Sequence, residues 1–318
     1  MEQPNLIYVK PSYAKSPLSE EEARNFTISE TGATHARDHT IGSAVGGNVR
    51  WVDGVLSADE CKRLIAAVDA SPHLSFWSPS GKDDAEAKAF RDADTVEMSN
   101  PVLGTFLWER LIEALGSGSL AECLAPIDIS EEQDSELCGH WVPQSPLNHD
   151  LLFAKYPSGG SFAPHTDGRA IHNFNRRSFQ SVILFLNDVP DGCGGGTRFY
   201  SGDALNQLCK DQQGRWTASP EWVKVEVSPK AGRLLFFDQE LLHEGVPCAA
   251  PCTKYIIRSD VMYDRTPAVC DSPKDQAAYA MFRQAEHLAE AGEVAESLKL
   301  FAKSWKLSPK MAQMMRQC

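Results

Sequence analysis

The middle of the chain contains five short apolar or alternating segments with no helical segment between them. These segments are LLFAKY, SFQSVILFLND, EWVKVEV, RLLFFD and KYIIRSDVMY, and turn sequences such as PDGCGGG and SPKAG bound them. Runs of this length and composition are typical of β-strands. Because no crossover helix separates them, they predict an antiparallel sandwich or jelly roll rather than a parallel sheet. The polar stretch from Gly202 to Pro220 is expected to be a loop inserted between two of the strands.

Helical patterns lie on both sides of this β-rich region. SADECKRLIAAVDA begins with a capping box formed by Ser57 and Glu60, and a second helix is expected to start at Asn100 and Pro101. Near the C-terminus, AAYAMFRQAEHLAEAGEVAESLKLFAKSWKLSPKMA predicts two helices hinged near Gly292. This pair resembles a single tetratricopeptide repeat. Because one such repeat cannot bury its own apolar face, we expect it to pack on the main domain or on a partner.

These patterns predict an α+β chain in three parts. Residues 1–48 mix Pro, Ser, Thr and Gly without a sustained period and are expected to form an irregular arm. Residues 49–270 are expected to form the β domain with its N-terminal helices, and residues 271–318 the C-terminal helical segment.

Composition excludes several classes of protein. The net charge of −12 argues against a general nucleic-acid binder, which needs basic patches to neutralise phosphates. No apolar run approaches the roughly 20 residues of a membrane span, and we see no signal peptide. The nine cysteines are scattered and odd in number, which suggests free thiols in a reducing compartment. We therefore expect a cytoplasmic protein without a membrane or nucleic-acid partner, monomeric or weakly oligomeric.

The sequence GGSFAPHTDG contains a pair of potential metal ligands, His165 and Asp167. Residues i and i+2 of a strand project to the same face, so both can reach one ion. The best third ligand is His243, which follows the apolar strand LLFFD, and His172 competes with it from a polar stretch. Two imidazoles and one carboxylate are the ligand set of non-haem Fe(II) oxygenases, although zinc hydrolases also use it.

The strand after His243 carries two cations on one face. Period two places Lys254, Ile256 and Arg258 together, and few carboxylates lie nearby in the sequence to pair with the cations. Since a buried cation must be paired, a ligand carboxylate is the expected partner. Tyr156, just before the glycine turn that leads to His165, could donate its hydroxyl to the same group.

Five segments in order, AKYPSGGSFAPHTDG, SVILFLND, GGGTRFY, AGRLLFFDQELLHEG and KYIIRSDVMY, resemble the double-stranded β-helix (jelly roll) core of Fe(II)- and 2-oxoglutarate-dependent dioxygenases. The branch they resemble is that of the prolyl 4-hydroxylase-like oxygenases, and the likeness covers roughly residues 148 to 264. The resemblance implies an iron triad of His165, Asp167 and His243. It also implies that Lys254, or alternatively Arg258, binds the distal carboxylate of 2-oxoglutarate.

The resemblance further implies a contact between Tyr156 and the co-substrate, and it contains one departure. Phe185 stands where some relatives carry a co-substrate-binding tyrosine, so Ser181 or Thr197 is expected to supply the missing donor. The implied cofactors are Fe(II), 2-oxoglutarate as co-substrate and O2, with ascorbate as a reductant. Succinate and CO2 are the implied co-products.

Substrate contacts are expected from the segment after the H-x-D pair. The candidates there are Arg169, His172, Asn173 and Arg176. Arginines in a protein of net charge −12 indicate a carboxylate-bearing substrate or partner group, whereas the simpler interpretation is that they face solvent.

Three hypotheses follow for the function. The first is hydroxylation or oxidative ring closure of an amino-acid-derived small molecule. The second is hydroxylation of prolyl residues in a protein, for which the repeat-like C-terminus could be a docking surface. The third is a catalytically inactive β-domain that serves as an interaction module.

Overall fold

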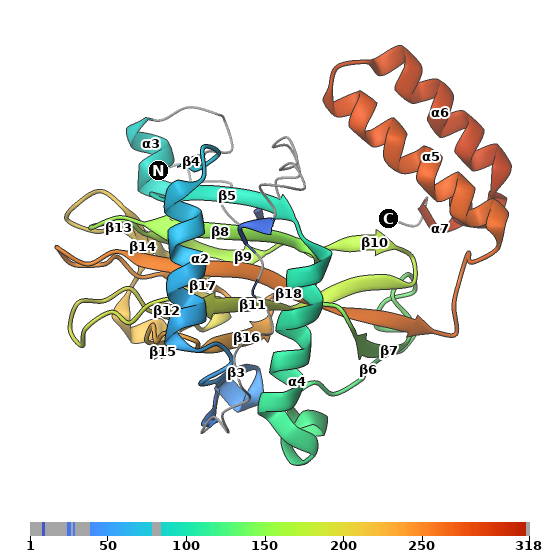
Figure 1. Cartoon of the computed structure of the whole chain (residues 1–318). Helices are drawn as coiled ribbons and strands as arrows, with labels where there is room; N and C mark the ends of the chain where they lie inside the picture. The colour runs from blue at the N-terminus through green and yellow to red at the C-terminus, as the bar shows by residue number, and fades with distance from the viewer. Residues whose placement is uncertain (1–7, 10–23, 27, 29–38, 78–83, 316–318) are drawn as a thin grey trace. The chain divides into compact units, whose positions relative to one another are not determined.

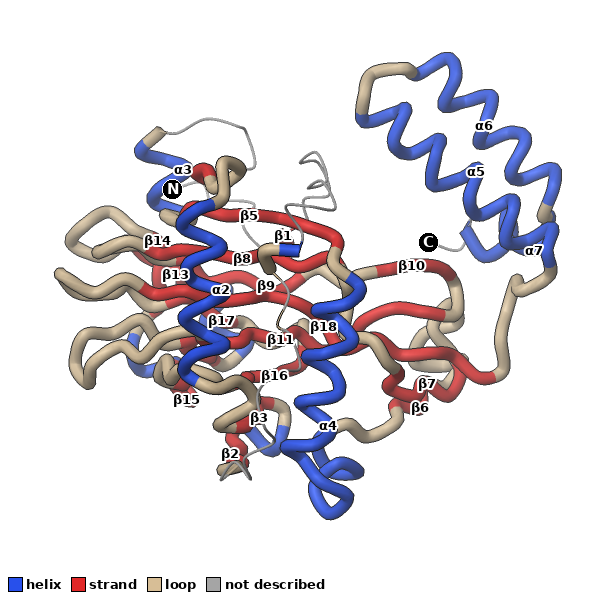
Figure 2. Tube along the Cα trace, in the orientation of Figure 1, coloured by secondary structure: helices blue, strands red, loops and turns tan. Residues whose placement is uncertain are grey.

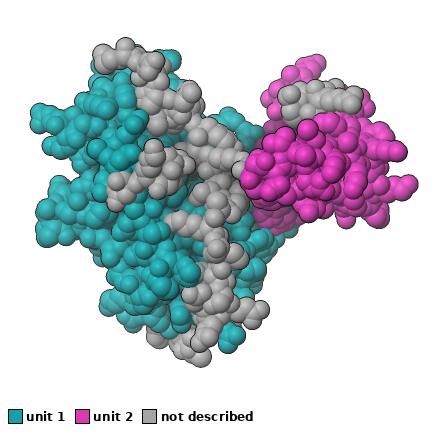
Figure 3. All heavy atoms as spheres, turned by 90° about the horizontal axis from the view of Figure 1, so that it is seen from above, with its two compact units in different colours: residues 1–124, 144–170, 178–262 teal, residues 125–143, 171–177, 263–318 magenta. Residues whose placement is uncertain are grey.

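The computed structural model describes residues 8–9, 24–26, 28, 39–77 and 84–315. The chain divides into two compact units, which Figure 3 colours separately. Unit 1 draws on residues 1–124, 144–170 and 178–262, and unit 2 on residues 125–143, 171–177 and 263–318. Most of the expected N-terminal arm, namely residues 1–7, 10–23, 27 and 29–38, lies outside the described residues.

Unit 1 is built around two sheets (Figures 1 and 2). The smaller sheet has the order β1 (Tyr8–Val9), β9 (Phe162–Asp167), β17 (His243–Gly245), β12 (Thr197–Tyr200) and β15 (Val223–Val227). The main path of the larger sheet has the order β2 (Ile41–Ala44), β3 (Val49–Val52), β16 (Leu234–Asp238), β11 (Arg176–Phe185), β18 (Lys254–Thr266), β8 (Asp150–Tyr156), β5 (Asp94–Ser99) and β4 (Ser75–Phe76). Apart from the parallel pair β1 and β9, the pairs with a defined register are antiparallel, which confirms the predicted jelly roll.

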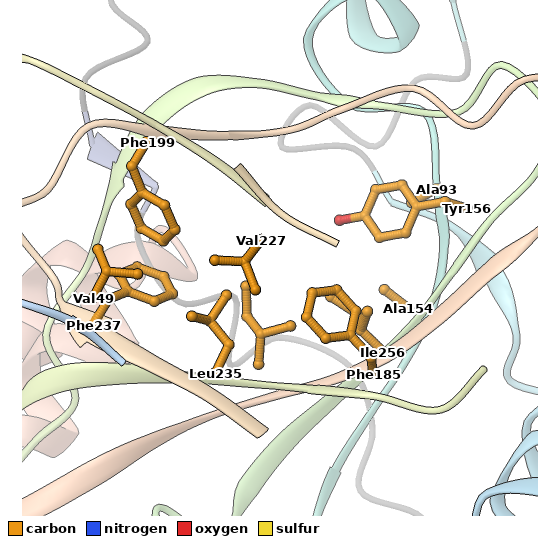
Figure 4. Packing of buried hydrophobic residues seen from close by; sticks show 11 residues of the cluster. Val49, Ala93, Ala154, Tyr156, Phe185, Phe199, Val227, Leu235, Phe237 and Ile256 are labelled. Carbon is orange, nitrogen blue, oxygen red and sulfur yellow. The ribbon is translucent and has the colours of Figure 1, made fainter. Parts of the chain in front are cut away.

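Side chains from both sheets meet in one apolar core. Phe199 and Val227 enter it from the smaller sheet, and Phe185, Leu235 and Phe237 from the larger one (Figure 4). Strand alternation explains this arrangement, because Ser181, Ile183 and Phe185 lie on one face of β11, while Val182 and Leu184 are buried on the other face. Figure 4 also shows the hydroxyl of Tyr156 directed into this interior.

Helices of unit 1 begin at the predicted caps. In α2 (Ala58–Ala70), the Ser57 hydroxyl accepts a hydrogen bond from the Glu60 amide at 3.2 Å, and the Glu60 carboxylate accepts one from the Ser57 amide at 2.6 Å. In α4 (Pro101–Cys123), the Asn100 side chain accepts from the Leu103 amide, which confirms the predicted start of this helix. In Figure 1, α2 and α4 run across the strands of the larger sheet. The short helix α3 (Ala85–Phe90) precedes β5.

One expectation about an irregular segment is wrong. Residues 202–220 are not a plain loop, because they form the 3-10 helix η2 (Gly202–Gln207) and a hairpin of β13 (Leu208–Lys210) and β14 (Trp216–Ala218). Ala204 and Ala218 of this segment are buried in a small core with Tyr200 and Leu242. The polar sequence of the segment does not indicate this contact. Strands β1 and β2 also lie within the stretch expected to be an irregular arm. The remaining 3-10 helices of unit 1 are η1 (Val45–Gly47) and η3 (Pro220–Trp222).

Unit 2 has a core of its own. The elements of unit 2 are β6 (Ile127–Ile129), β7 (Gly139–Gln144), β10 (Ile171–Asn173), α5 (Pro273–Glu290), α6 (Val294–Leu307) and α7 (Pro309–Met315). Cys270, Ala278, Tyr279 and Met311 are buried together, with Phe174 packed against them. Gly292 joins α5 to α6 at a φ of 84°, which glycine adopts without strain, so the predicted hinge is confirmed. The likeness to a tetratricopeptide repeat stays a prediction. No described helix is long and apolar enough to cross a membrane.

Candidate metal centre

The predicted triad meets at the junction of β9 and β17. These strands pair antiparallel with His243 opposite His165, and Asp167 lies two residues further along β9 on the same face. The His165 Nε2 is 3.6 Å from the Asp167 Oδ1, and the His243 Nε2 is 3.7 Å from the Asp167 Oδ2. All three potential ligand atoms lie within 4.8 Å of one another. An ion about 2.1 Å from each ligand atom can bridge neighbours up to about 4.2 Å apart, so both histidine–aspartate distances suit one ion.

Backbone carbonyls fix the orientation of both imidazoles. The Nδ1 of His165 lies 2.7 Å from the carbonyl oxygen of Ala163, and the Nδ1 of His243 lies 2.8 Å from that of Leu241. A carbonyl oxygen only accepts, so each Nδ1 carries the proton and each Nε2 keeps its lone pair for a metal. The donor set therefore fits a divalent ion with open coordination positions.

The triad is enclosed by aromatic rings. His165 and His243 are 2% and 3% exposed, and Phe162 stacks on His165 with ring centroids 3.7 Å apart. Phe237 packs against His243 at 4.6 Å. Burial, with the neighbouring His165, lowers the pKa of His243 to about 4, so this imidazole is neutral at pH 7. A neutral imidazole is the form that binds a metal.

Asp167 is held by Ser181 and Arg258. The Ser181 hydroxyl donates to the Asp167 Oδ2 at 2.5 Å, and an Nη of Arg258 lies 3.6 Å from the same oxygen. Burial alone would raise the pKa of Asp167, but Arg258 and the two histidines outweigh it and hold this pKa well below the ordinary value. The carboxylate is therefore ionised and oriented before a metal arrives.

Sequence reasoning missed the partner of Arg258. Both Nη atoms of Arg258 lie 3.0 Å from the carboxylate of Asp260, which is fully buried. Asn148 and Gln239 donate to the same carboxylate at 2.9 and 2.7 Å. Asp260 stands two residues after Arg258 on β18, so strand alternation could have indicated the pair.

Lys254 occupies a different position from Arg258. It is 2% exposed, and its Nζ lies 4.5 Å from the ring centroid of Tyr156, its partner on β8. The ammonium lies beside Gly245, where an added Cβ would come within 3.7 Å of the Nζ. Gly245 is two residues along β17 from His243. Thr197 pairs with Gly245 across the smaller sheet and is also buried. Burial lowers the pKa of Lys254 to about 8.

The predicted substrate contacts fall in both units. Arg169, in unit 1, pairs with Glu240 and lies over the ring of Phe179. His172, Asn173 and Arg176 belong to unit 2, where Arg176 donates to Asp264 at 2.8 Å. Their role toward a substrate, and the alternative of His172 as a ligand, stay predictions.

Comparisons with known proteins show which families and structures this chain is similar to. Residues 151–259 match the sequence model described as the 2OG-Fe(II) oxygenase superfamily, whereas no curated protein matches the chain. Similar solved structures include the viral collagen prolyl hydroxylase vCPH of Paramecium Bursaria Chlorella virus-1, with 18% identity over 70% of this chain and 99% of that chain and a TM-score of 0.41. A prolyl-4-hydroxylase of Pseudomonas putida has 17% identity over 69% of this chain and 92% of that chain, with a TM-score of 0.38. The epimerase SnoN from nogalamycin biosynthesis has 16% identity over 69% of this chain and 78% of that chain, with a TM-score of 0.40. The matched residues 151–259 include His165, Asp167 and His243, so this part of the chain is similar to the 2OG-Fe(II) oxygenase superfamily.

Proposed function

We propose that the protein is an Fe(II)- and 2-oxoglutarate-dependent oxidoreductase that hydroxylates, or closes a ring in, an amino-acid-derived small molecule. The observation that carries this proposal is the convergence of His165, Asp167 and His243 with both Nε2 atoms unprotonated. When bound, iron would activate O2, which would oxidise 2-oxoglutarate to succinate and CO2 and an unactivated C–H bond of the substrate.

Residues of the chain divide the work of holding these groups. His165, Asp167 and His243 would hold the metal, while Ser181 and Arg258 orient the Asp167 carboxylate rather than bind the co-substrate. The distal carboxylate of 2-oxoglutarate would bind Lys254, beside Gly245.

Two neighbours of Lys254 complete this co-substrate site in our proposal. Tyr156 pairs with Lys254 and directs its hydroxyl into the interior (Figure 4), and Thr197 pairs with Gly245. Both can donate a hydrogen bond to a carboxylate. The enclosure of the metal ligands supports a small substrate, because His165 and His243 are nearly inaccessible to solvent.

Metal binding and co-substrate turnover test the proposal separately. The iron-loaded protein, with ascorbate as reductant, is incubated with 2-oxoglutarate and panels of free amino acids and proline-containing peptides, and succinate is measured by mass spectrometry. We expect metal-dependent succinate formation that amino-acid-derived compounds stimulate. His165→Ala should abolish both Mn(II) binding and turnover, whereas His140→Ala, at an exposed histidine of unit 2, should change neither.

The outcomes separate the three hypotheses. Stimulation by peptides alone would instead identify a prolyl hydroxylase acting on proteins. Metal binding without any succinate would contradict the proposed activity and favour an inactive interaction module.

A further inference from the structure

Arg91 is a buried cation outside the metal centre. It follows α3 and is 4% exposed, and its backbone forms a β-bridge with Phe162 on β9. Its Nε is buried without a hydrogen-bond acceptor, and among the described residues no carboxylate pairs with its guanidinium. Burying a charge without a partner is costly, so such a group indicates a ligand.

Aromatic rings surround the guanidinium. Its Cζ lies 4.6 Å from the ring centroids of both Trp77 and Phe162, and 6.0 Å from that of Tyr156. The rings attract the cation but offer no oxygen to accept its N–H groups. The N–H groups of a guanidinium lie in its plane, and a carboxylate binds them through two parallel hydrogen bonds.

The position of Arg91 relates it to the metal centre. Phe162, which Arg91 contacts, stacks on His165 with centroids 3.7 Å apart. The guanidinium and a metal ligand therefore contact the same aromatic ring, so a molecule bound to Arg91 would lie close to the reacting centre.

The number of carboxylates on 2-oxoglutarate indicates that Arg91 binds a different molecule. Lys254 is the second buried cation beside Tyr156, at 4.5 Å from its ring centroid. In the proposed function, one carboxylate of 2-oxoglutarate is used at the metal and the other at Lys254. No carboxylate of the co-substrate then remains for Arg91, so its anion must come from another molecule.

We propose that Arg91 binds a carboxylate of the substrate, so that the substrate is a carboxylic acid rather than its amide or a residue within a peptide chain. This inference rests on the proposed function and names its substrate class. Arg91 takes part in no chemical step. Its guanidinium only binds the acid and orients it beside the metal centre.

Matched acids and amides test this inference by binding alone. The probes are the free amino acids, their N-acetyl derivatives, and the corresponding amides, added to the Mn(II)- and 2-oxoglutarate-loaded protein. Binding is followed by the rise in melting temperature and by tryptophan fluorescence, because Trp77 lies beside Arg91. At least one acid should bind roughly tenfold to a hundredfold more tightly than its amide, as expected for a hydrogen bond to a charged group.

Variants locate this preference. Arg91→Met keeps an apolar side chain between the rings and should bind acid and amide equally, while Arg91→Lys should retain only part of the preference. Lys88→Met, at an exposed cation on the same helix, should behave as the wild type. The affinity for 2-oxoglutarate should stay within about twofold in Arg91→Met but fall at least tenfold in Lys254→Met.

Three results would overturn the inference. The first is that no acid in the panel binds better than its amide, and the second is that the preference survives in Arg91→Met. The third is a loss of 2-oxoglutarate binding in Arg91→Met as large as that in Lys254→Met, which would place Arg91 in the co-substrate site. Absence of succinate from the metal-loaded wild type would reject the proposed function instead, and the acid–amide comparison would still report on Arg91.

Discussion

Replacing Lys254 by methionine should make the metal-free protein more stable while weakening its binding of 2-oxoglutarate. Lys254 is 2% exposed, and burial lowers its pKa from the ordinary 10.5 to about 8. Since one pKa unit corresponds to about 1.4 kcal/mol, the charged side chain costs the folded state about 3 kcal/mol at neutral pH. Methionine has a similar length and no charge, so Lys254→Met should raise the free energy of unfolding by up to about 3 kcal/mol.

The lowered pKa of Lys254 determines how the stability difference between the variant and the wild type changes with pH. Because the folded-state pKa of Lys254 lies below the unfolded one, the unfolded chain binds more protons between pH 8 and 10.5. Over that interval Lys254 makes the wild type more stable as pH rises. The stability difference between Lys254→Met and the wild type should therefore be constant below about pH 8 and shrink between pH 8 and 10.5.

Urea unfolding of the two metal-free proteins at several pH values measures the stability difference, and calorimetric titration of the Mn(II)-loaded proteins measures the affinity for 2-oxoglutarate. We expect that affinity to fall about tenfold to a hundredfold in the variant. Lys155→Met is the matched control, because Lys155 pairs with Asp69 at 2.7 Å at the surface and should change stability by no more than about 1 kcal/mol. A destabilised Lys254→Met that still binds 2-oxoglutarate normally would refute the reasoning.

Three further predictions concern the metal centre and the fold. The folded-state pKa of His243, about 4, lies below the ordinary 6.5, so the metal-free protein should lose up to about 3 kcal/mol of stability as pH falls from 6.5 to 4. In urea unfolding, His243→Gln should lack this dependence of stability on pH. An equal dependence in both proteins would contradict the prediction. Arg258→Lys removes the paired contacts with Asp260 that hold the guanidinium beside Asp167, and it should weaken Mn(II) binding about tenfold to a hundredfold by calorimetry. Unchanged affinity would contradict this prediction. Ser57→Ala removes a helix cap and should lower the free energy of unfolding by about 1 kcal/mol, measured by thermal unfolding, without altering the affinity for Mn(II). A change in that affinity would contradict a purely structural role.

Local sequence patterns predicted the elements of the fold because their determinants lie within a few residues. The bonds between Ser57 and Glu60 and the cap at Asn100 need no other part of the chain. The hairpin of β13 and β14 could not be predicted in this way. Its polar sequence becomes ordered because Ala218 meets Tyr200 and Leu242, which are distant in the sequence.

The same distinction applies to the site. Alternation along β9 placed His165 and Asp167 on one face, and the triad followed once His243 was chosen. The contact of Arg258 with Asp167 was not predicted, because Asp167 reaches it from another strand, whereas Asp260 lies on the same strand and alternation could have indicated it. Arg91 carried no motif at all, since its burial depends on Trp77 and other rings from separate segments.

The hydrogen bonds of the two histidines have a consequence for redesign. Each imidazole donates its Nδ1 proton to the carbonyl two residues earlier in the chain, at Ala163 and at Leu241. No second side chain takes part in these two bonds, so substitutions around the substrate can alter selectivity without turning the ligand rings. Libraries that vary residues such as Arg91 and Trp77 should therefore yield altered specificities from a scaffold that still loads its metal.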